Sequence, residues 1–220
     1  MIAVTFALPT ESSTFTKLLA AAQISSADVH VIHTGVGRTA SERTIRAFLA
    51  AHSPALLISS GFAGALTSEL KVGDVFLAEN FTSRTWLARC QQVLGEGTRT
   101  GMLATAAAIT DTPAERADFA LRTGAVAVDM ETEFIAHACS EASVQMVSLR
   151  AISDTPAAPL PAPPAVLFYV ESQKTNYGRL ARHVAQHPGS AVRLYAFARQ
   201  IATARESLGA SLMMLVRNAL

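Results

Sequence analysis

The chain has little cysteine, few aromatic side chains and almost no net charge. Among its 220 residues are two cysteines, one tryptophan and three tyrosines, and 18 basic residues nearly balance 17 acidic ones. Proteins that bind nucleic acid usually carry a basic surplus that neutralises phosphates, so this balance predicts no nucleic-acid partner. The hydrophobic content of 50% argues in turn against disorder.

Signals for secretion, membrane insertion and disulfide formation are also missing. No segment approaches the run of ~18 apolar residues that a membrane span needs. The start of the chain, MIAVTFALPTE, lacks the basic residues and the cleavage site of a secretory signal. Cys90 and Cys139 form no CxxC or metal-type cluster, so we expect two free thiols in a reducing compartment. These absences predict a cytoplasmic protein without a membrane span.

Several catalytic motifs are absent as well. The sequence contains no GxSxG elbow, no GxxxxGK[ST] phosphate loop and no HExxH zinc spacing. Residues 35–40 match the GxGxxA form of the dinucleotide fingerprint, but the next strand ends at Ser60 without the acid that would hold a ribose. We therefore expect neither a metal nor an organic cofactor. Gly35 and Gly37 are interpreted as points where the backbone comes close to a ligand or a neighbouring loop.

What the sequence does contain is a regular alternation of apolar runs and helical segments. We predict strands at Ile2–Leu8, Val29–His33, Leu56–Ser59, Val75–Ala78, Met102–Ala107, Ala125–Val128 and Gln145–Ala151. We predict helices at Glu11–Ala22, Thr39–Ala51, Glu131–Glu141, Tyr169–His187 and Ser190–Asn218. The last helix is expected to bury a stripe made of Val192, Tyr195, Ala198, Ile201 and Leu208. The alternation predicts an α/β fold with a largely parallel central sheet flanked by helices, and the length suits a single domain of residues 1–220.

Three acidic residues directly follow apolar runs. They are Glu11, Glu131 and Asp154. Each one alone is explained as a charge at a helix start or as a turn residue. Ligands bind at the carboxyl ends of strands in such sheets, so we expect the three to meet there. Cleavage of an N-glycosidic bond needs such a set, because one acid protonates the leaving group while another handles the nucleophile.

Six sequence blocks occur in order along residues 1–155. They are ALPTE (7–11), TGVG (34–37), SGFAGAL (60–66), LKVGDV (70–75), VDME (128–131) and RAISD (150–154). Together they resemble the purine and uridine phosphorylase superfamily, and within it the 5′-methylthioadenosine/S-adenosylhomocysteine nucleosidases. The resemblance implies a three-layer nucleoside phosphorylase-like fold, with a mixed sheet, and an enzyme that cleaves a purine nucleoside.

The resemblance also implies a role for individual residues. Asp154 matches the general acid that protonates N7 of the leaving purine, which requires a protonated carboxyl group near neutral pH. Glu11 matches the acid that orients the attacking water, and Arg150 an arginine that helps to hold that water. Glu131 matches the carboxylate that accepts hydrogen bonds from the ribose hydroxyls. The other expected substrate-binding positions are Met130, which packs on the sugar, Ala63 and Gly64, which line the ribose and base, and Phe62, Ile109 and Ser153.

Departures from the family pattern bear on the nucleophile and the substrate. Ser59 and Phe62 replace the phosphate-binding arginine and serine of the phosphorylases, which favours water as nucleophile. Ile109 stands where a base-stacking aromatic is expected, and the segment between Asp74 and Gly101 is shorter than usual. The proline-rich residues 160–164 and the long last helix look like the hopanoid-associated phosphorylases, whose proposed substrate is adenosylhopane.

These observations predict hydrolysis of a purine nucleoside, with a 5′-modified adenosine as substrate. Two alternatives stay open: phosphorolysis of the same bond, and binding of a nucleoside without turnover. The expected partner is the small-molecule nucleoside, and the resemblance implies a homodimer or a larger homo-oligomer.

Overall fold

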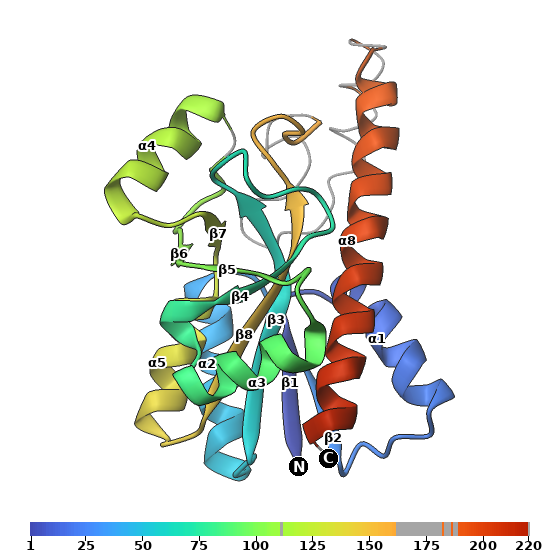
Figure 1. Cartoon of the computed structure of the whole chain (residues 1–220), viewed down its shortest axis with the longest axis vertical. Helices are drawn as coiled ribbons and strands as arrows, with labels where there is room; N and C mark the ends of the chain where they lie inside the picture. The colour runs from blue at the N-terminus through green and yellow to red at the C-terminus, as the bar shows by residue number, and fades with distance from the viewer. Residues whose placement is uncertain (111, 162–181, 183–185, 187–188, 220) are drawn as a thin grey trace.

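The computed structural model of the chain, drawn in Figure 1, describes residues 1–110, 112–161, 182, 186 and 189–219. Within these residues eight strands form one sheet with the order β2-β1-β3-β8-β4-β5, to which β6 and β7 are joined by the pairing of β7 with β3. The strands are β1 (Ile2–Phe6), β2 (Val29–His33), β3 (Leu56–Ala65), β4 (Val75–Ala78), β5 (Arg99–Gly101), β6 (Leu103–Thr105), β7 (Ala127–Asp129) and β8 (Met146–Asp154). The sheet is mixed and mostly parallel, because only the pairs β4–β8 and β3–β7 among these described strands are antiparallel.

Helices cover both faces of the sheet and produce three layers (Figure 1). One face carries α1 (Pro9–Ala21), α3 (Arg84–Leu94) and α8 (Gly189–Ala219), and the other carries α2 (Arg38–Ala51) and α5 (Thr132–Glu141). Phe15 and Leu208 belong to the apolar cluster under the first group, and Ile45 and Ile135 to the cluster under the second. The predicted α/β fold with a mixed, largely parallel sheet is confirmed.

The two central strands extend beyond their predicted ends. β3 continues to Ala65 instead of Ser59, and β8 continues to Asp154 instead of Ala151. The prediction ended β3 at a glycine turn, but β3 and β8 pair in parallel from Leu57 to Gly64, and this pairing carries both strands onward. Asp154 therefore belongs to a strand, where the sheet fixes its backbone.

Four elements that lie between β4 and β7 were not predicted. They are the short 3-10 helix η1 (Glu79–Phe81), α3, β5 and a further helix, α4 (Pro113–Thr123). Helix α4 begins with a capping box in which Thr112 and Glu115 satisfy each other's backbone N–H groups. In Figure 1, α4 stands apart from the other helices, toward the end of the sheet where β3 and β8 finish.

The last helix begins one residue before its predicted start. Of its predicted buried stripe, Leu208 is buried and Ile201 half-buried, whereas the other three positions are exposed. Val192 and Tyr195 are 73% and 68% exposed, and Ala198 is also exposed. The first turns of α8 extend past the end of the sheet (Figure 1). The buried stripe lies further along, at Ala204, Leu208 and Leu212, preceded by the half-buried Phe197 and Ile201. The helix predicted at Tyr169–His187 lies outside the described residues.

The two cysteines are free, as predicted, and both are buried. Burial raises the pKa of the Cys90 thiol to about 11 and that of the Cys139 thiol to about 12. In the parts of the chain that the structure describes, no helix has the length and apolar character to cross a membrane.

Candidate active site

A cavity of about 220 Å³ lies at the carboxyl ends of β3 and β8, with α1 and α8 on one side. All the predicted site residues except Arg150 line it: Glu11, Phe62, Ala63, Gly64, Ile109, Met130, Glu131, Ser153 and Asp154. They come from segments far apart in the sequence, and the fold brings them to one place. Glu11, Glu131 and Asp154 are therefore grouped as expected.

Glu11 lies in the first turn of α1 and ties this helix to β3. Its carboxylate accepts a hydrogen bond from the backbone N–H of Leu8 at 2.9 Å and another from that of Phe62 at 3.2 Å. Burial raises the pKa of Glu11, although these two N–H groups and the charge of Arg150 act in the opposite direction. Gly61 has φ +153°, and a Cβ there would lie 3.3 Å from Glu11 Oε1, so glycine leaves room for the buried carboxylate.

Glu131 reaches the cavity from a strand that runs opposite to β3. β7 pairs antiparallel with β3, with Val128 opposite Gly64, so its carboxyl end points back along β3. The expected shared edge of parallel strands therefore does not explain its position. Glu131 Oε1 accepts a hydrogen bond from the backbone N–H of Gly37 at 2.8 Å, at the start of α2. This contact is the close backbone approach that was expected of the glycine turn, and Gly37 has the φ of +78° that favours glycine.

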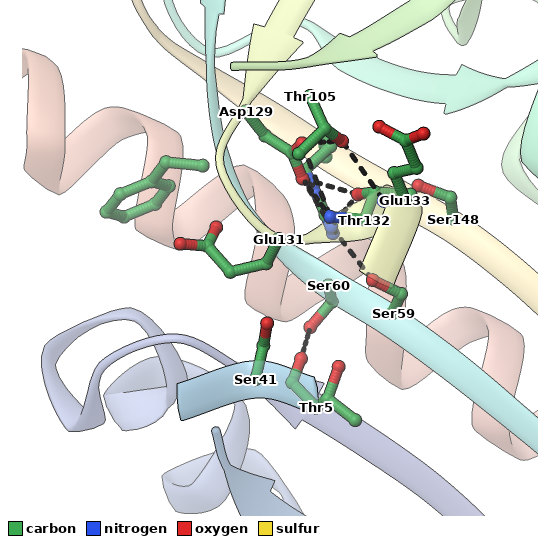
Figure 2. Close-up of polar contacts among 12 residues, drawn as sticks. Thr5, Ser41, Ser59, Ser60, Thr105, Asp129, Glu131, Thr132, Glu133 and Ser148 are labelled. Atoms are coloured by element: carbon green, nitrogen blue, oxygen red, sulfur yellow. Dashed lines mark hydrogen bonds and ion pairs between the residues drawn. The ribbon is translucent and has the colours of Figure 1, made fainter. Parts of the chain in front are cut away.

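Arg150 does not line the cavity but lies in a buried polar network with Asp129, Thr132 and Ser59, three residues that Figure 2 labels. Its side chain is 2% exposed, and Nε and Nη2 donate to Asp129 Oδ2 at 3.1 and 2.9 Å. Nη2 also donates to the hydroxyls of Ser59, at 2.8 Å, and Thr132. Figure 2 shows the carboxylate of Glu131 directed away from this network. Arg150 therefore lies where it can act on the cavity through the residues it holds and through its charge.

Asp154 faces the cavity from the end of β8 and is held by two donors. Its Oδ1 accepts a hydrogen bond from Ser153 Oγ at 2.6 Å, and its Oδ2 pairs with the guanidinium of Arg116 from α4. Arg116 is 1% exposed and also donates from Nη1 to the carbonyl of Ala65 at 2.7 Å. The sequence analysis did not identify Arg116, because nothing in the polar helix sequence AERADFALR marks one arginine as buried.

The apolar wall of the cavity was also missed. It is formed by Leu8, Val36, Leu160, Phe197 and Ile201, together with the predicted Phe62 and Ile109. Two of these side chains come from α8, and no local pattern distinguishes a helix position that faces a cavity from one that faces the core. Among the described residues, no cluster of three or more histidine, cysteine, aspartate or glutamate side chains could hold a metal ion.

We expect Glu131 to make the protein less stable as the pH rises. Burial, and then the neighbouring Asp129 carboxylate, raise the pKa of Glu131 from 4.5 to about 8. At a pH between these two pKa values, Glu131 holds a proton in the folded protein that it has released in the unfolded chain. The contribution to the free energy of unfolding is therefore complete below about pH 4.5 and is lost as the pH rises through about 8.

Glu131→Gln should remove this titration, because an amide does not ionise in this pH range. Its amide oxygen still accepts the hydrogen bond from Gly37, so the contact itself is kept. Urea unfolding at pH 5, 7 and 9 should give a flatter pH dependence for Glu131→Gln than for the wild type. Glu69→Gln, which changes an exposed glutamate, serves as the control. An equally steep loss of stability in Glu131→Gln would contradict the prediction.

Comparisons with known proteins identify the family and the fold of the chain. The sequence matches the model of the phosphorylase superfamily over residues 10–92 and 79–187. A 5′-methylthioadenosine/S-adenosylhomocysteine nucleosidase of Haemophilus influenzae (strain PittEE) is 26% identical over 177 residues, which are 66% of this chain and 76% of that protein. The fold resembles futalosine hydrolase of Helicobacter pylori, with a TM-score of 0.71 and 16% identity over 100% of this chain and 97% of that one. It also resembles the 5′-methylthioadenosine/S-adenosylhomocysteine nucleosidase of Helicobacter pylori, with a TM-score of 0.71 and 16% identity over 100% and 98% of the two chains. The chain belongs to the phosphorylase superfamily.

Proposed function

We propose that the protein cleaves the N-glycosidic bond of a purine nucleoside by hydrolysis. One observation carries this proposal: three carboxyl groups, those of Glu11, Glu131 and Asp154, converge from separate segments on one cavity that is otherwise mostly apolar. Membership of the phosphorylase superfamily and the similarity to a nucleosidase support the same reaction class.

In this reaction the bond between C1′ and N9 breaks, and its electron pair leaves with the base. Asp154 acts in its protonated form, with Ser153 and Arg116 as donors to its two oxygens, and transfers the proton to N7, so that the purine departs neutral. Water attacks C1′, and the proton that it loses is accepted by Glu11. The ionised form of Glu131, which its raised pKa disfavours without substrate, accepts hydrogen bonds from the ribose hydroxyls, and these bonds strengthen as the sugar gains positive charge. Met130, which lines the cavity next to Glu131, packs against the sugar.

Water is the favoured nucleophile because none of the described residues that line the cavity is basic and could hold phosphate. Among the described residues that form its wall, none is lysine, arginine or histidine. The two buried arginines nearby are already paired with carboxylates, Arg150 with Asp129 and Arg116 with Asp154. A phosphate dianion would therefore meet the carboxylates of the site without a compensating charge.

The apolar wall favours a nucleoside with an apolar 5′ substituent. Leu8, Val36, Phe197 and Ile201 give the cavity a surface that excludes water and binds hydrocarbon or a thioether. A 5′-modified adenosine, such as methylthioadenosine or adenosylhopane, fits this chemistry. A polar sugar end would bury hydroxyl groups there without partners.

The test is release of free base from adenosine, methylthioadenosine, inosine and adenosylhopane, each with and without phosphate. We expect release without phosphate, fastest from a substrate with an apolar 5′ group. Asp154→Asn should reduce the rate by about 10²- to 10⁴-fold. Release that depends on phosphate and yields ribose 1-phosphate would show a phosphorylase instead. If a nucleoside binds but no base is released, the protein is a binder and the catalytic proposal is wrong.

A further inference from the structure

Helix α4 packs on the rest of the molecule through the half-buried Phe119 and Ala120 and through a buried arginine. Within α4, all of which the structure describes, the only buried residue is Arg116. The other side chains of the helix are exposed or half-buried, and Leu121 is 86% exposed. Burying a guanidinium group is unfavourable unless its partners compensate, so an apolar residue would anchor the helix at lower cost. The arginine at this position therefore calls for a role beyond anchoring α4.

The guanidinium of Arg116 lies directly behind the carboxyl group of Asp154. Nη2 pairs with Asp154 Oδ2 and Nη1 donates to the carbonyl of Ala65, so the planar group spans from β8 to the end of β3. Its Nε is buried and contacts no acceptor among the described residues. The guanidinium thus donates to Asp154 and to one backbone carbonyl, while its Nε–H has no acceptor among the described residues.

Gly64 of β3 leaves room for the pair of Asp154 and Arg116. A Cβ at Gly64 would lie 3.0 Å from Asp154 Oδ2 and 3.2 Å from Arg116 Nη1. On the other side, Ser153 Oγ donates to Asp154 Oδ1 at 2.6 Å. The carboxyl group is thereby held from two directions in the orientation that faces the cavity, whose wall includes Asp154 but not Arg116.

We propose that Arg116 is a positioning residue that orients the Asp154 carboxyl group toward the leaving base. The inference rests on the proposed function, because it concerns the acid that protonates the purine. It assigns Arg116 no contact with substrate. Arg116 acts only through Asp154, the proton donor. Replacing Arg116 should therefore slow only those reactions in which the leaving group needs a proton.

Two substrates separate this role from general structural support. One is the purine nucleoside that the wild type cleaves best, and the other is 4-nitrophenyl β-D-ribofuranoside, whose leaving group departs as an anion without a proton. For Arg116→Met we expect kcat on the purine nucleoside to fall by about 10- to 100-fold, a part of the total effect of a general acid, with little change in KM. On the nitrophenyl riboside, kcat should stay within about twofold of the wild type.

Further variants keep the test decisive if Arg116→Met folds poorly or the riboside is a poor substrate. Arg116→Lys keeps the charge but cannot bridge to both partners, so it should lose less activity with the same selectivity. Arg122→Met, on an exposed position of the same helix, should behave as the wild type. On the purine nucleoside, adding Arg116→Met to Asp154→Asn should cause no further loss.

The outcomes separate the two proposals. Equal losses on both substrates, or additive losses with Asp154→Asn, would reduce Arg116 to structural support and overturn the inference. Wild-type activity in Arg116→Met would overturn it as well. In each of these cases the wild type still releases base, so the proposed function stands. A wild type that releases no base from any nucleoside would overturn the proposed function, and this inference with it.

Discussion

Glu11→Gln should reduce the rate of base release by about 10²- to 10⁴-fold with little change in nucleoside binding. The amide has nearly the same size as the carboxylate but cannot accept the proton of the attacking water. Glu11 is 7% exposed, lines the cavity and is fixed by the N–H groups of Leu8 and Phe62, so its position is set before any substrate arrives. Burial raises the pKa of Glu11, which makes its carboxylate a stronger base than an exposed glutamate.

Two measurements check this prediction. Steady-state rates and a direct binding assay should give a loss in kcat without a matching loss in affinity, and circular dichroism should confirm that the variant is folded. Glu69→Gln makes the same chemical change on the surface and should keep full activity. If Glu11→Gln releases base at nearly the wild-type rate, Glu11 does not act on the nucleophile.

Arg150→Met should have the largest effect on stability, a loss of about 3–5 kcal/mol. The Arg150 side chain contributes the positive charge of a buried ion pair, and Asp129, its partner, is only 6% exposed. Removing the guanidinium leaves the Asp129 carboxylate buried without a compensating charge. A loss of this size is a large fraction of the 5–15 kcal/mol that typically stabilises a domain.

The double variant Asp129→Asn/Arg150→Met provides the control. It removes the unpaired charge together with its partner, so it should recover part of the stability that Arg150→Met loses. The free energy of unfolding in urea measures both. A loss below 1 kcal/mol for Arg150→Met, or no recovery in the double variant, would mean that the pair contributes little to the fold.

The family pattern predicts that Arg150 helps to hold the attacking water, and this role stays a prediction. Arg150 does not line the cavity, and its donors are engaged by Asp129, Ser59 and Thr132. Its charge nevertheless acts on Glu11, whose pKa it lowers against the effect of burial. Any catalytic effect of Arg150 is indirect. Arg150 holds Asp129 and Thr132, the residues on either side of the segment that contains Glu131, and its charge favours the ionised form of Glu11.

Local chemistry explains why much of this site was predictable. Glu11 and Asp154 follow apolar runs that could only be strands, and parallel strands present their carboxyl ends at the same edge. The glycines of the Ser60–Gly64 block mark places where a Cβ would come close to the carboxylates of Glu11 and Asp154, and Gly37 donates its backbone N–H to Glu131. These are properties of short segments, so a single sequence reveals them.

The sequence by itself determined the alternating α/β pattern and the three carboxyl groups, because period, β-branched content and position after a strand are local features. Only the tertiary structure decided how far β3 and β8 extend, that β7 turns Glu131 back along β3, and that Phe197 and Ile201 of α8 complete the cavity. It also decided that Arg116 is buried behind Asp154 while Arg122, one and a half turns later in the same helix, is exposed. Strand length, strand direction and the burial of a given side chain depend on which distant segment packs against that residue. The neighbouring residues in the sequence do not encode this information.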